Sequence, residues 1–214
     1  MSRIAIKICG LSTSDTVGAA VRAGASHVGF VHFRKSPRHV DVGQMQSLAA
    51  IAPAHVERVA VVVDPDDDML AALTAGGMLS AIQLHGKESP DRVAAIRRRF
   101  GLSVWKAISV KTRADIAAAD AYVGIADRLL FDAKTPDGAA LPGGMGLRFD
   151  WTLLRGLALP MPWGLSGGLG IGNAADAIRI TDAPLVDISS GVESAPGIKD
   201  VDKIMAFCKA VAQC

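Results

Sequence analysis

The chain has 214 residues, half of them apolar and 5% aromatic, with 23 basic against 21 acidic side chains. So small a charge surplus gives no electrostatic case for binding nucleic acid or an anionic membrane. No apolar run in the sequence reaches the roughly 18 residues of a membrane span, and its N-terminus lacks the apolar stretch of a signal peptide. Three scattered cysteines are too few for a disulfide framework. We therefore expect a reduced, cytoplasmic protein.

Short β-rich runs alternate with Ala-rich helical stretches along the chain. We expect strands at 4–9, 27–33, 57–64, 81–85, 103–109, 128–133, 162–166 and 185–190. The helical stretches that follow them lie at 14–24, 41–52, 66–77, 89–100, 112–124, 149–157, 173–180 and 200–211. This pattern predicts an α/β protein with a single (β/α)8 TIM-barrel domain over residues 1–214. The alternative is an open doubly wound sheet, but ICGLSTSD after the first strand is not the G-x-G-x-x-G loop that such a sheet would want.

Each expected strand presents two sets of side chains, because successive residues point to opposite faces. In the strand at 81–85, for example, Ile82 and Leu84 alternate with Gln83 and His85. We expect the bulky apolar set to pack on the helices and the polar set to lie inside the barrel. Strand tips of a barrel gather on the face that carries the chemistry. This face would bring together Cys9, His85, Asp132, Ser166, Asp187 and Ser189.

Cys9 and Asp132 are the candidate reactive groups. Cys9 is either a small core residue or a base or nucleophile, and the second role needs an electropositive neighbour such as Lys7 or the amides of the next turn. Asp132 is either a turn cap paired with Lys134 or a general acid. His85 is either a substrate ligand or a hydrogen-bonded core imidazole.

Two glycine-rich segments, SGGLGIGN at 166–173 and DISSGVE at 187–193, follow the last two strands. Exposed backbone N–H groups in the loops after strands seven and eight hold phosphate in many barrels, so we expect a phosphate site here. RKSPRH at 34–39 is either a solvated basic loop or the source of an arginine that binds a carboxylate. The five histidines show no metal-ligand spacing, and we expect no metal site.

Six segments in order resemble the phosphoribosylanthranilate isomerase family. They begin with KICGLS, GFVHFRKSPRHV and IQLHG, and continue with FDAKTP and GLRFDW, SGGLGIGN, and VDISSGVESAPGIKD. Two features depart from the family pattern. Phe33 and Arg34 stand where the family often has an aromatic residue followed by proline. The loop at 134–148 is longer than usual, with added bulk at residues 139–142.

The resemblance implies the Amadori rearrangement of N-(5-phosphoribosyl)anthranilate, without metal or organic cofactor, in a monomer or homodimer. It makes Asp132 the general acid, Cys9 the general base and Arg38 the group that binds the anthranilate carboxylate. The implied phosphate-binding residues are Ser166, Gly167, Gly168, Ser189, Ser190 and Gly191. Further implied substrate-binding residues are Lys7, Gln83, His85 and Asp187.

Two other functions remain open at this point. One is a related phosphosugar barrel enzyme, similar to indoleglycerol-phosphate synthase or ribulose-phosphate epimerase. Such an enzyme would be expected to use lysine, a carboxylate set or metal ligands in place of Cys9 and Asp132. The other is a non-catalytic protein that binds a phosphorylated metabolite.

Overall fold

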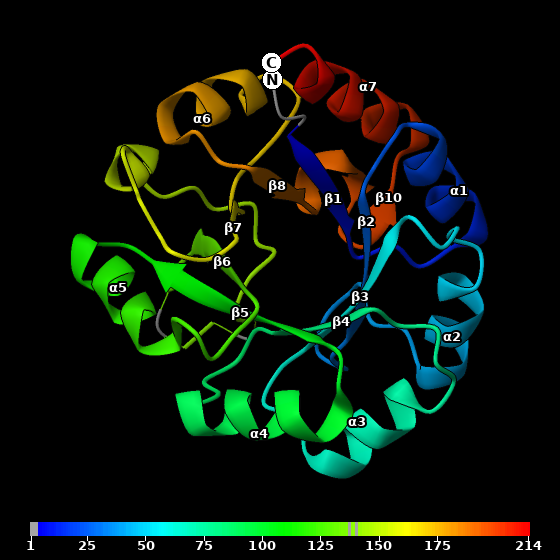
Figure 1. The fold of residues 1–214 in the computed structure, drawn as a ribbon. Helices are drawn as coiled ribbons and strands as arrows, with labels where there is room; N and C mark the ends of the chain where they lie inside the picture. The colour runs from blue at the N-terminus through cyan, green and yellow to red at the C-terminus, as the bar shows by residue number, and fades with distance from the viewer. Residues whose placement is uncertain (1–3, 137, 140) are drawn as a thin grey trace.

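The computed structural model of the chain describes residues 4–136, 138–139 and 141–214. Eight parallel strands pair in the order β1 to β8 and close into a barrel (Figure 1), which confirms the predicted (β/α)8 architecture. The strands are β1 Ala5–Cys9, β2 His27–His32, β3 Glu57–Val62, β4 Ala81–Leu84, β5 Ser103–Val110, β6 Arg128–Ala133, β7 Trp163–Leu165 and β8 Leu185–Ile188. Each lies within or close to one of the predicted runs.

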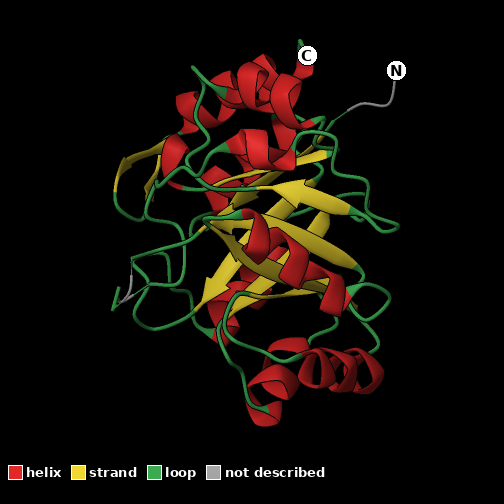
Figure 2. Cartoon of the chain, turned by 90° about the vertical axis from the view of Figure 1, so that its left-hand side faces the viewer, coloured by secondary structure: helices red, strands yellow, loops and turns green. Residues whose placement is uncertain are grey.

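The helices lie outside the strands (Figure 2). They are α1 Ser14–Arg22, α2 Val42–Ala49, α3 Asp67–Thr74, α4 Pro90–Phe100, α5 Arg113–Ala117, α6 Ala174–Thr181 and α7 Val201–Ala212. The side chains of Thr13, Asp41, Asp66 and Ser89 accept backbone N–H groups at the starts of the first four. This capping satisfies donors that have no partner inside the helix. In the part of the chain that the structure describes, no helix is long and apolar enough to cross a membrane.

The fifth and sixth units differ from the predicted pattern. The helix expected at 149–157 is only the 3-10 turn η2, Trp151–Leu154, and the segment at 112–124 splits into α5 and the 3-10 turn η1, Ala118–Tyr122. In η2 the two buried side chains, Trp151 and Leu154, are three residues apart, which suits the three-residue repeat of a 3-10 turn. These two side chains join the large core between strands and helices.

The predicted alternation of side chains is confirmed in the barrel wall. Ile6 and Ile8 of β1 belong to the large core between strands and helices. A separate small cluster of Val59, Ala81, Trp105, Leu130 and Leu185 packs together inside the barrel. These residues alternate with the outward-facing set, so the residues two positions later, among them Gln83, Asp132 and Asp187, lie above them.

A short antiparallel hairpin interrupts the connection from β8 to α7. A 3-10 turn, η3 Ser190–Val192, leads into β9 Glu193–Ala195 and β10 Ile198–Lys199. Gly197 in its turn packs closely against Pro37 of the loop after β2. The hairpin therefore links the last loop of the barrel to the second one.

Candidate active site

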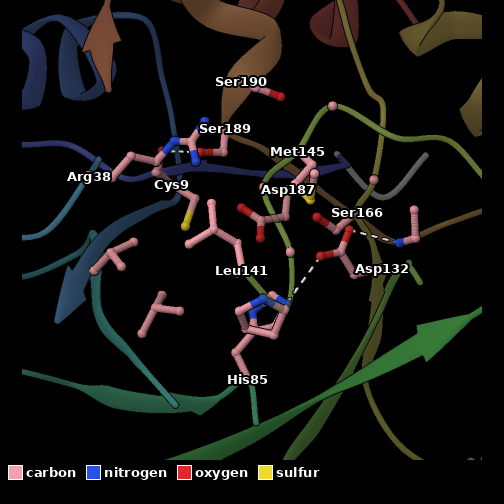
Figure 3. A pocket seen from close by; sticks show the side chains of 18 of the residues that line it. Cys9, Arg38, His85, Asp132, Leu141, Met145, Ser166, Asp187, Ser189 and Ser190 are labelled. Atoms are coloured by element: carbon pink, nitrogen blue, oxygen red, sulfur yellow. Dashed lines mark hydrogen bonds and ion pairs between the residues drawn. The ribbon is translucent and has the colours of Figure 1, made fainter. Parts of the chain in front are cut away.

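A cavity opens at the carboxyl ends of the strands and brings most of the predicted site residues together (Figure 3). Its walls come from the barrel strands and from the loops after β2, β6, β7 and β8. The predicted residues that line it are Cys9, Arg38, Gln83, His85, Asp132, Ser166, Gly167, Gly168, Asp187, Ser189 and Ser190. The register argument placed Cys9, His85, Asp132, Ser166, Asp187 and Ser189 on one face, and the structure shows these six around one space.

Lys7 and Gly191 are the two predicted residues that lie outside this lining. Lys7 is fully buried and donates to both carboxylate oxygens of Asp187 at 3.0 Å, beneath the cavity floor. The two residues are paired in register between β1 and β8. Gly191 lies against the backbone of Leu169. Lys7 therefore does not line the cavity itself but bonds to Asp187, which does.

Cys9 stands at the tip of β1 with 7% of its surface exposed. Burial raises the pKa of its thiol, while the positive charges of Lys7 and Lys199 oppose that rise. A Cβ at Gly29 would lie 3.1 Å from both Cys9 Sγ and Lys7 Nζ, so the glycine in β2 leaves room for both groups. The thiol thus has the electropositive neighbour that the sequence analysis required.

The surroundings of the Lys7–Asp187 pair shift the pKa values of both residues. Burial alone would lower the pKa of Lys7, but Asp187 and Cys9 outweigh burial and raise it. Burial raises the pKa of Asp187, and Lys7 opposes that rise. An ammonium that holds its proton beside Cys9 reduces the cost of the thiolate, while burial keeps the pKa of the thiol raised.

Asp132 ends β6 and is 4% exposed. Its Oδ1 accepts the Ala133 N–H at 2.9 Å, and its Oδ2 lies 3.1 Å from His85 Nε2. On the far side of the ring, His85 Nδ1 lies 3.1 Å from Gln83 Nε2. Because the Gln83 amide donates to Nδ1, the imidazole proton sits on Nε2 and points at Asp132. Gln83 and His85 therefore orient the carboxyl group of Asp132 as well as lining the cavity.

Arg38 is 5% exposed, so it is not part of a solvated basic loop. Its Nε and Nη2 donate to the two oxygens of Glu193 at 2.7 and 2.9 Å. Sequence reasoning missed Glu193 and its second partner, Lys199, because the contact joins positions 155 residues apart. The sequence did offer one signal. The Pro-Gly turn of VESAPGIK predicts a hairpin, and a hairpin would bring the opposite charges of Glu193 and Lys199 side by side.

Residues 141–147 of the loop after β6 cover the cavity. A Cβ at Gly143 would lie 2.6 Å from both Asp132 Oδ2 and His85 Nε2, and one at Gly144 would lie 2.8 Å from Arg38 Nη1. Glycine at these two positions lets the backbone lie directly on the carboxyl group and the guanidinium. Leu141 and Met145 add apolar surface to the lining, whereas Ala140 lies outside the described residues.

The two glycine-rich segments form the wall after β7 and β8. Asn173 braces the first of them by accepting the Gly170 N–H at 2.8 Å and donating to the Gly168 carbonyl at 2.9 Å. In the second, the Ser189 hydroxyl donates to the Cys9 carbonyl at 3.1 Å. Within the described ranges, no group of three or more His, Cys, Asp and Glu side chains is placed to hold a metal ion.

A barrel with a thiol, a carboxyl group, a buried arginine and two glycine-rich loops around one cavity belongs to the class of acid–base enzymes acting on small phosphorylated anions. Residues 6–210 match the family model for N-(5'phosphoribosyl)anthranilate (PRA) isomerase. Because that match spans most of the chain, the protein belongs to the N-(5'-phosphoribosyl)anthranilate isomerase family.

Curated relatives and solved structures support the same family. The chain is 56% identical over 205 residues to N-(5'-phosphoribosyl)anthranilate isomerase of Rhodopseudomonas palustris (strain BisA53), covering 96% of this chain and 94% of that one. It is 54% identical to the protein of that name from Zymomonas mobilis subsp. mobilis, with 96% of each chain covered. Phosphoribosyl anthranilate isomerase from Thermotoga maritima superposes with a TM-score of 0.88 at 32% identity, over 99% of this chain and 100% of that one. A phosphoribosyl anthranilate isomerase in complex with reduced 1-(o-carboxyphenylamino)-1-deoxyribulose 5-phosphate superposes with a TM-score of 0.84 at 31% identity, with the same coverage.

Proposed function

We propose how the residues of this cavity perform the reaction of the family. The chain is an isomerase of tryptophan biosynthesis that converts N-(5-phosphoribosyl)anthranilate into 1-(2-carboxyphenylamino)-1-deoxyribulose 5-phosphate. The observation that carries the assignment of roles is that Cys9 and Asp132, at the tips of β1 and β6, line the same cavity. Ring opening needs a proton donor and the next step needs an acceptor, so two groups on separate strands suit the task.

Asp132 is the general acid of the first step. Its carboxyl O–H gives a proton to the ribose ring oxygen while the bond from that oxygen to C1 breaks. The lone pair of the anthranilate nitrogen forms the new double bond to C1, which yields an iminium ion and the Asp132 carboxylate. His85, 3.1 Å from Oδ2, then donates to that carboxylate and stabilises it.

Cys9 is the general base of the second step. Its thiolate takes the proton from C2, the electrons of that C–H bond form the C1=C2 double bond, and the electrons of the C1=N double bond move to nitrogen to give an enolamine. The enolamine tautomerises to the ketone by gaining a proton at C1 and losing one from the C2 hydroxyl. The nitrogen of the substrate accepts the electrons, so the reaction needs no organic cofactor or metal ion.

Lys7 and Asp187 support Cys9 from below. Lys7 is fully buried and bonded to Asp187, so we propose that it acts through the charge that it presents to Cys9, not by contact with the substrate. Asp187 lines the cavity floor and is the member of the pair that faces the sugar.

Separate groups of the cavity wall hold the two charged ends of the substrate. We place the phosphate at the backbone and hydroxyl groups of Ser166, Gly167, Gly168, Ser189 and Ser190, with Gly191 completing the turn behind them. We place the anthranilate carboxylate at Arg38. Holding both ends turns the encounter of sugar, acid and base into a fixed geometry, which lowers the entropic part of the barrier.

Turnover of freshly prepared N-(5-phosphoribosyl)anthranilate tests the proposal. Loss of anthranilate-type fluorescence should follow addition of the protein alone, and mass spectrometry should show a product of unchanged mass. A product lighter by water and carbon dioxide would indicate synthase chemistry instead. The variant Cys9→Ala should lose turnover while still binding the reduced product analogue, and near-normal activity in this variant would exclude Cys9 as the base.

We also infer a cytoplasmic location and a monomer or homodimer. The mechanism needs Cys9 as a thiol, and a reducing compartment preserves it. The cavity is lined by residues of one chain, so either assembly has complete sites. Light scattering of the purified protein distinguishes the two, and a larger oligomer would contradict the inference.

A further inference from the structure

Three buried charges form a cluster at the edge of the cavity. Arg38 of the β2 loop pairs with Glu193 of β9 at 2.7 Å, and Glu193 pairs with Lys199 of β10 at 2.6 Å. Their side chains are 6%, 5% and 1% exposed, respectively. At such burial, solvent and salt screen the three charges only weakly, so their sum matters to any ion that binds beside them.

The net charge of the cluster shows why Lys199, its third member, is needed. Arg38 and Glu193 share two parallel hydrogen bonds, and as a pair they carry no net charge. A second carboxylate approaching Arg38 would be attracted by the guanidinium and repelled by Glu193. Lys199 brings the cluster to a net charge of +1, which restores the attraction for one incoming anion.

Lys199 does not line the cavity itself but donates to Glu193 and to Ser189 at its edge. Its Nζ donates to Glu193 Oε1 at 2.6 Å, to the Ser189 carbonyl at 3.0 Å and to the Ser189 hydroxyl at 3.2 Å. These contacts use the donors of its ammonium group. Lys199 is absent from the cavity lining, so it acts through its charge and through the position of Glu193.

Arg38 keeps one donor edge for a ligand. Glu193 occupies Nε and one edge of Nη2, whereas Nη1 faces Gly144, which lines the cavity. The remaining Nη1 and Nη2 hydrogens form a second fork that fits a carboxylate. Glu193 thus fixes the guanidinium by one edge, and the other edge lies toward Gly144 at the cavity wall.

The protonation of the cluster is consistent with this count. Burial works against the ionised form of Glu193, but Arg38 and Lys199 outweigh it and lower the pKa of this carboxyl. Burial lowers the pKa of Lys199, and Glu193 opposes that fall.

We propose that Lys199 is a specificity-determining residue that offsets Glu193, so that Arg38 retains a net positive charge for the aromatic carboxylate of the substrate. The inference rests on the proposed function, because it needs that carboxylate at Arg38. It adds that a residue outside the cavity sets the preference for an anionic over a neutral aromatic amine.

Calorimetry with two ligands tests the proposal. One is reduced 1-(o-carboxyphenylamino)-1-deoxyribulose 5-phosphate, and the other is its phenylamino counterpart, which lacks the carboxyl group. The carboxylate preference is the ratio of their dissociation constants. Lys199→Met should lower this preference by on the order of tenfold. Loss of its bonds to Ser189 in the phosphate site affects both ligands alike and cancels in the ratio. The double variant Glu193→Gln with Lys199→Met removes one charge of each sign, returns the cluster to +1 and should recover most of the preference.

Two further variants serve as controls. Lys203→Met removes a neighbouring cation that is partly exposed and bonded to the Glu193 carbonyl, and it should leave the preference unchanged within about twofold. Lys199→Arg keeps the charge and should keep the preference, which tests the inference even if Lys199→Met does not fold.

The outcomes separate the inference from the proposed function. If Arg38→Met abolishes the preference while Lys199→Met keeps it, the inference is wrong and the proposed carboxylate site stands. If Arg38→Met keeps the preference, the carboxylate does not bind at Arg38 and that part of the proposed function is wrong. If the double variant prefers the carboxylate no more than Lys199→Met does, charge balance is not the cause and the inference is overturned.

Discussion

The two ends of the barrel interior contrast sharply although the same strands build both. Toward the amino ends, Leu130 of β6 and Leu185 of β8 belong to an apolar cluster that fills the barrel. Two residues further along, Asp132 and Asp187 face the cavity. Side chains two residues apart on a strand point the same way and are separated by about 7 Å.

The difference teaches how stability and chemistry are divided in this chain. The lower cluster is apolar and packed, so it contributes to stability by burial. The upper layer holds Lys7, Cys9, Asp132 and Asp187, whose burial costs free energy that the packed strands below must offset. A substitution in the lower cluster should therefore change the free energy of unfolding more than the turnover rate. A substitution in the upper layer should change the turnover rate more than the free energy of unfolding.

The largest effect should come from the upper layer. Asp132→Asn keeps the shape of the side chain but removes the acidic proton, so kcat should fall by about 10²- to 10⁴-fold. The affinity for the reduced product analogue and the midpoint of denaturant unfolding should change little. Steady-state kinetics, calorimetry and urea titration measure the three quantities. A kcat within a few-fold of wild type would remove Asp132 from its role.

A substitution in the lower cluster should show the opposite pattern. Leu185 is fully buried, and Leu185→Ala should lower the free energy of unfolding by about 2–5 kcal/mol through lost burial and a cavity. At 25 °C the folded fraction should keep a kcat close to wild type. Urea unfolding followed by two probes should also give one coincident transition, as we propose for a single domain over residues 1–214. Two separate transitions would contradict that proposal.

A change in pH should also alter the free energy of unfolding, through the titration of His27 at the start of β2. Burial, together with the charges of Arg128 and Lys7, lowers the pKa of His27 from 6.5 to about 3. Between these values the unfolded chain binds a proton that the folded chain does not, so acid should destabilise the fold. The loss should approach about 1.4 kcal/mol for each pH unit within that window.

The variant His27→Asn supplies the comparison for this effect. It lacks the titration and should lose less stability than wild type between pH 6.5 and 4, measured by urea unfolding at each pH. Parallel losses in the two proteins would mean that another group causes the acid sensitivity.

Much of the fold and the site could be predicted from the sequence because both depend on local pattern. Alternation along IQLH and RLLFDA places Gln83, His85 and Asp132 inside the barrel, and a closed barrel puts strand tips on one face. The prediction of a full helix at 149–157 is wrong, because the buried positions Trp151 and Leu154 fit a 3-10 turn as well as a helix.

The parts that escaped prediction are the contacts between distant segments. Glu193 and Lys199 look like ordinary surface charges in the sequence, and only the hairpin that packs on Pro37 brings them to Arg38. The Lys106–Glu88 pair at 3.0 Å, which braces the loop after His85 through the Gly86 N–H, escaped for the same reason. Which partner each of these charged side chains meets depends on tertiary packing, and no local sequence pattern encodes that packing.

The most direct test of the account is whether the ionisation of Cys9 controls the reaction. In a Cys214→Ser background, the pH dependence of Cys9 alkylation by iodoacetamide gives the thiolate population of the free protein, and Cys9→Ala identifies its contribution. Burial raises the pKa of this thiol, so alkylation should rise with pH through the alkaline range. Because the reaction needs the Cys9 thiolate and the Asp132 acid together, kcat/KM should be bell-shaped, with one limb at the midpoint of alkylation. A kcat/KM profile with no limb at that midpoint would contradict the account.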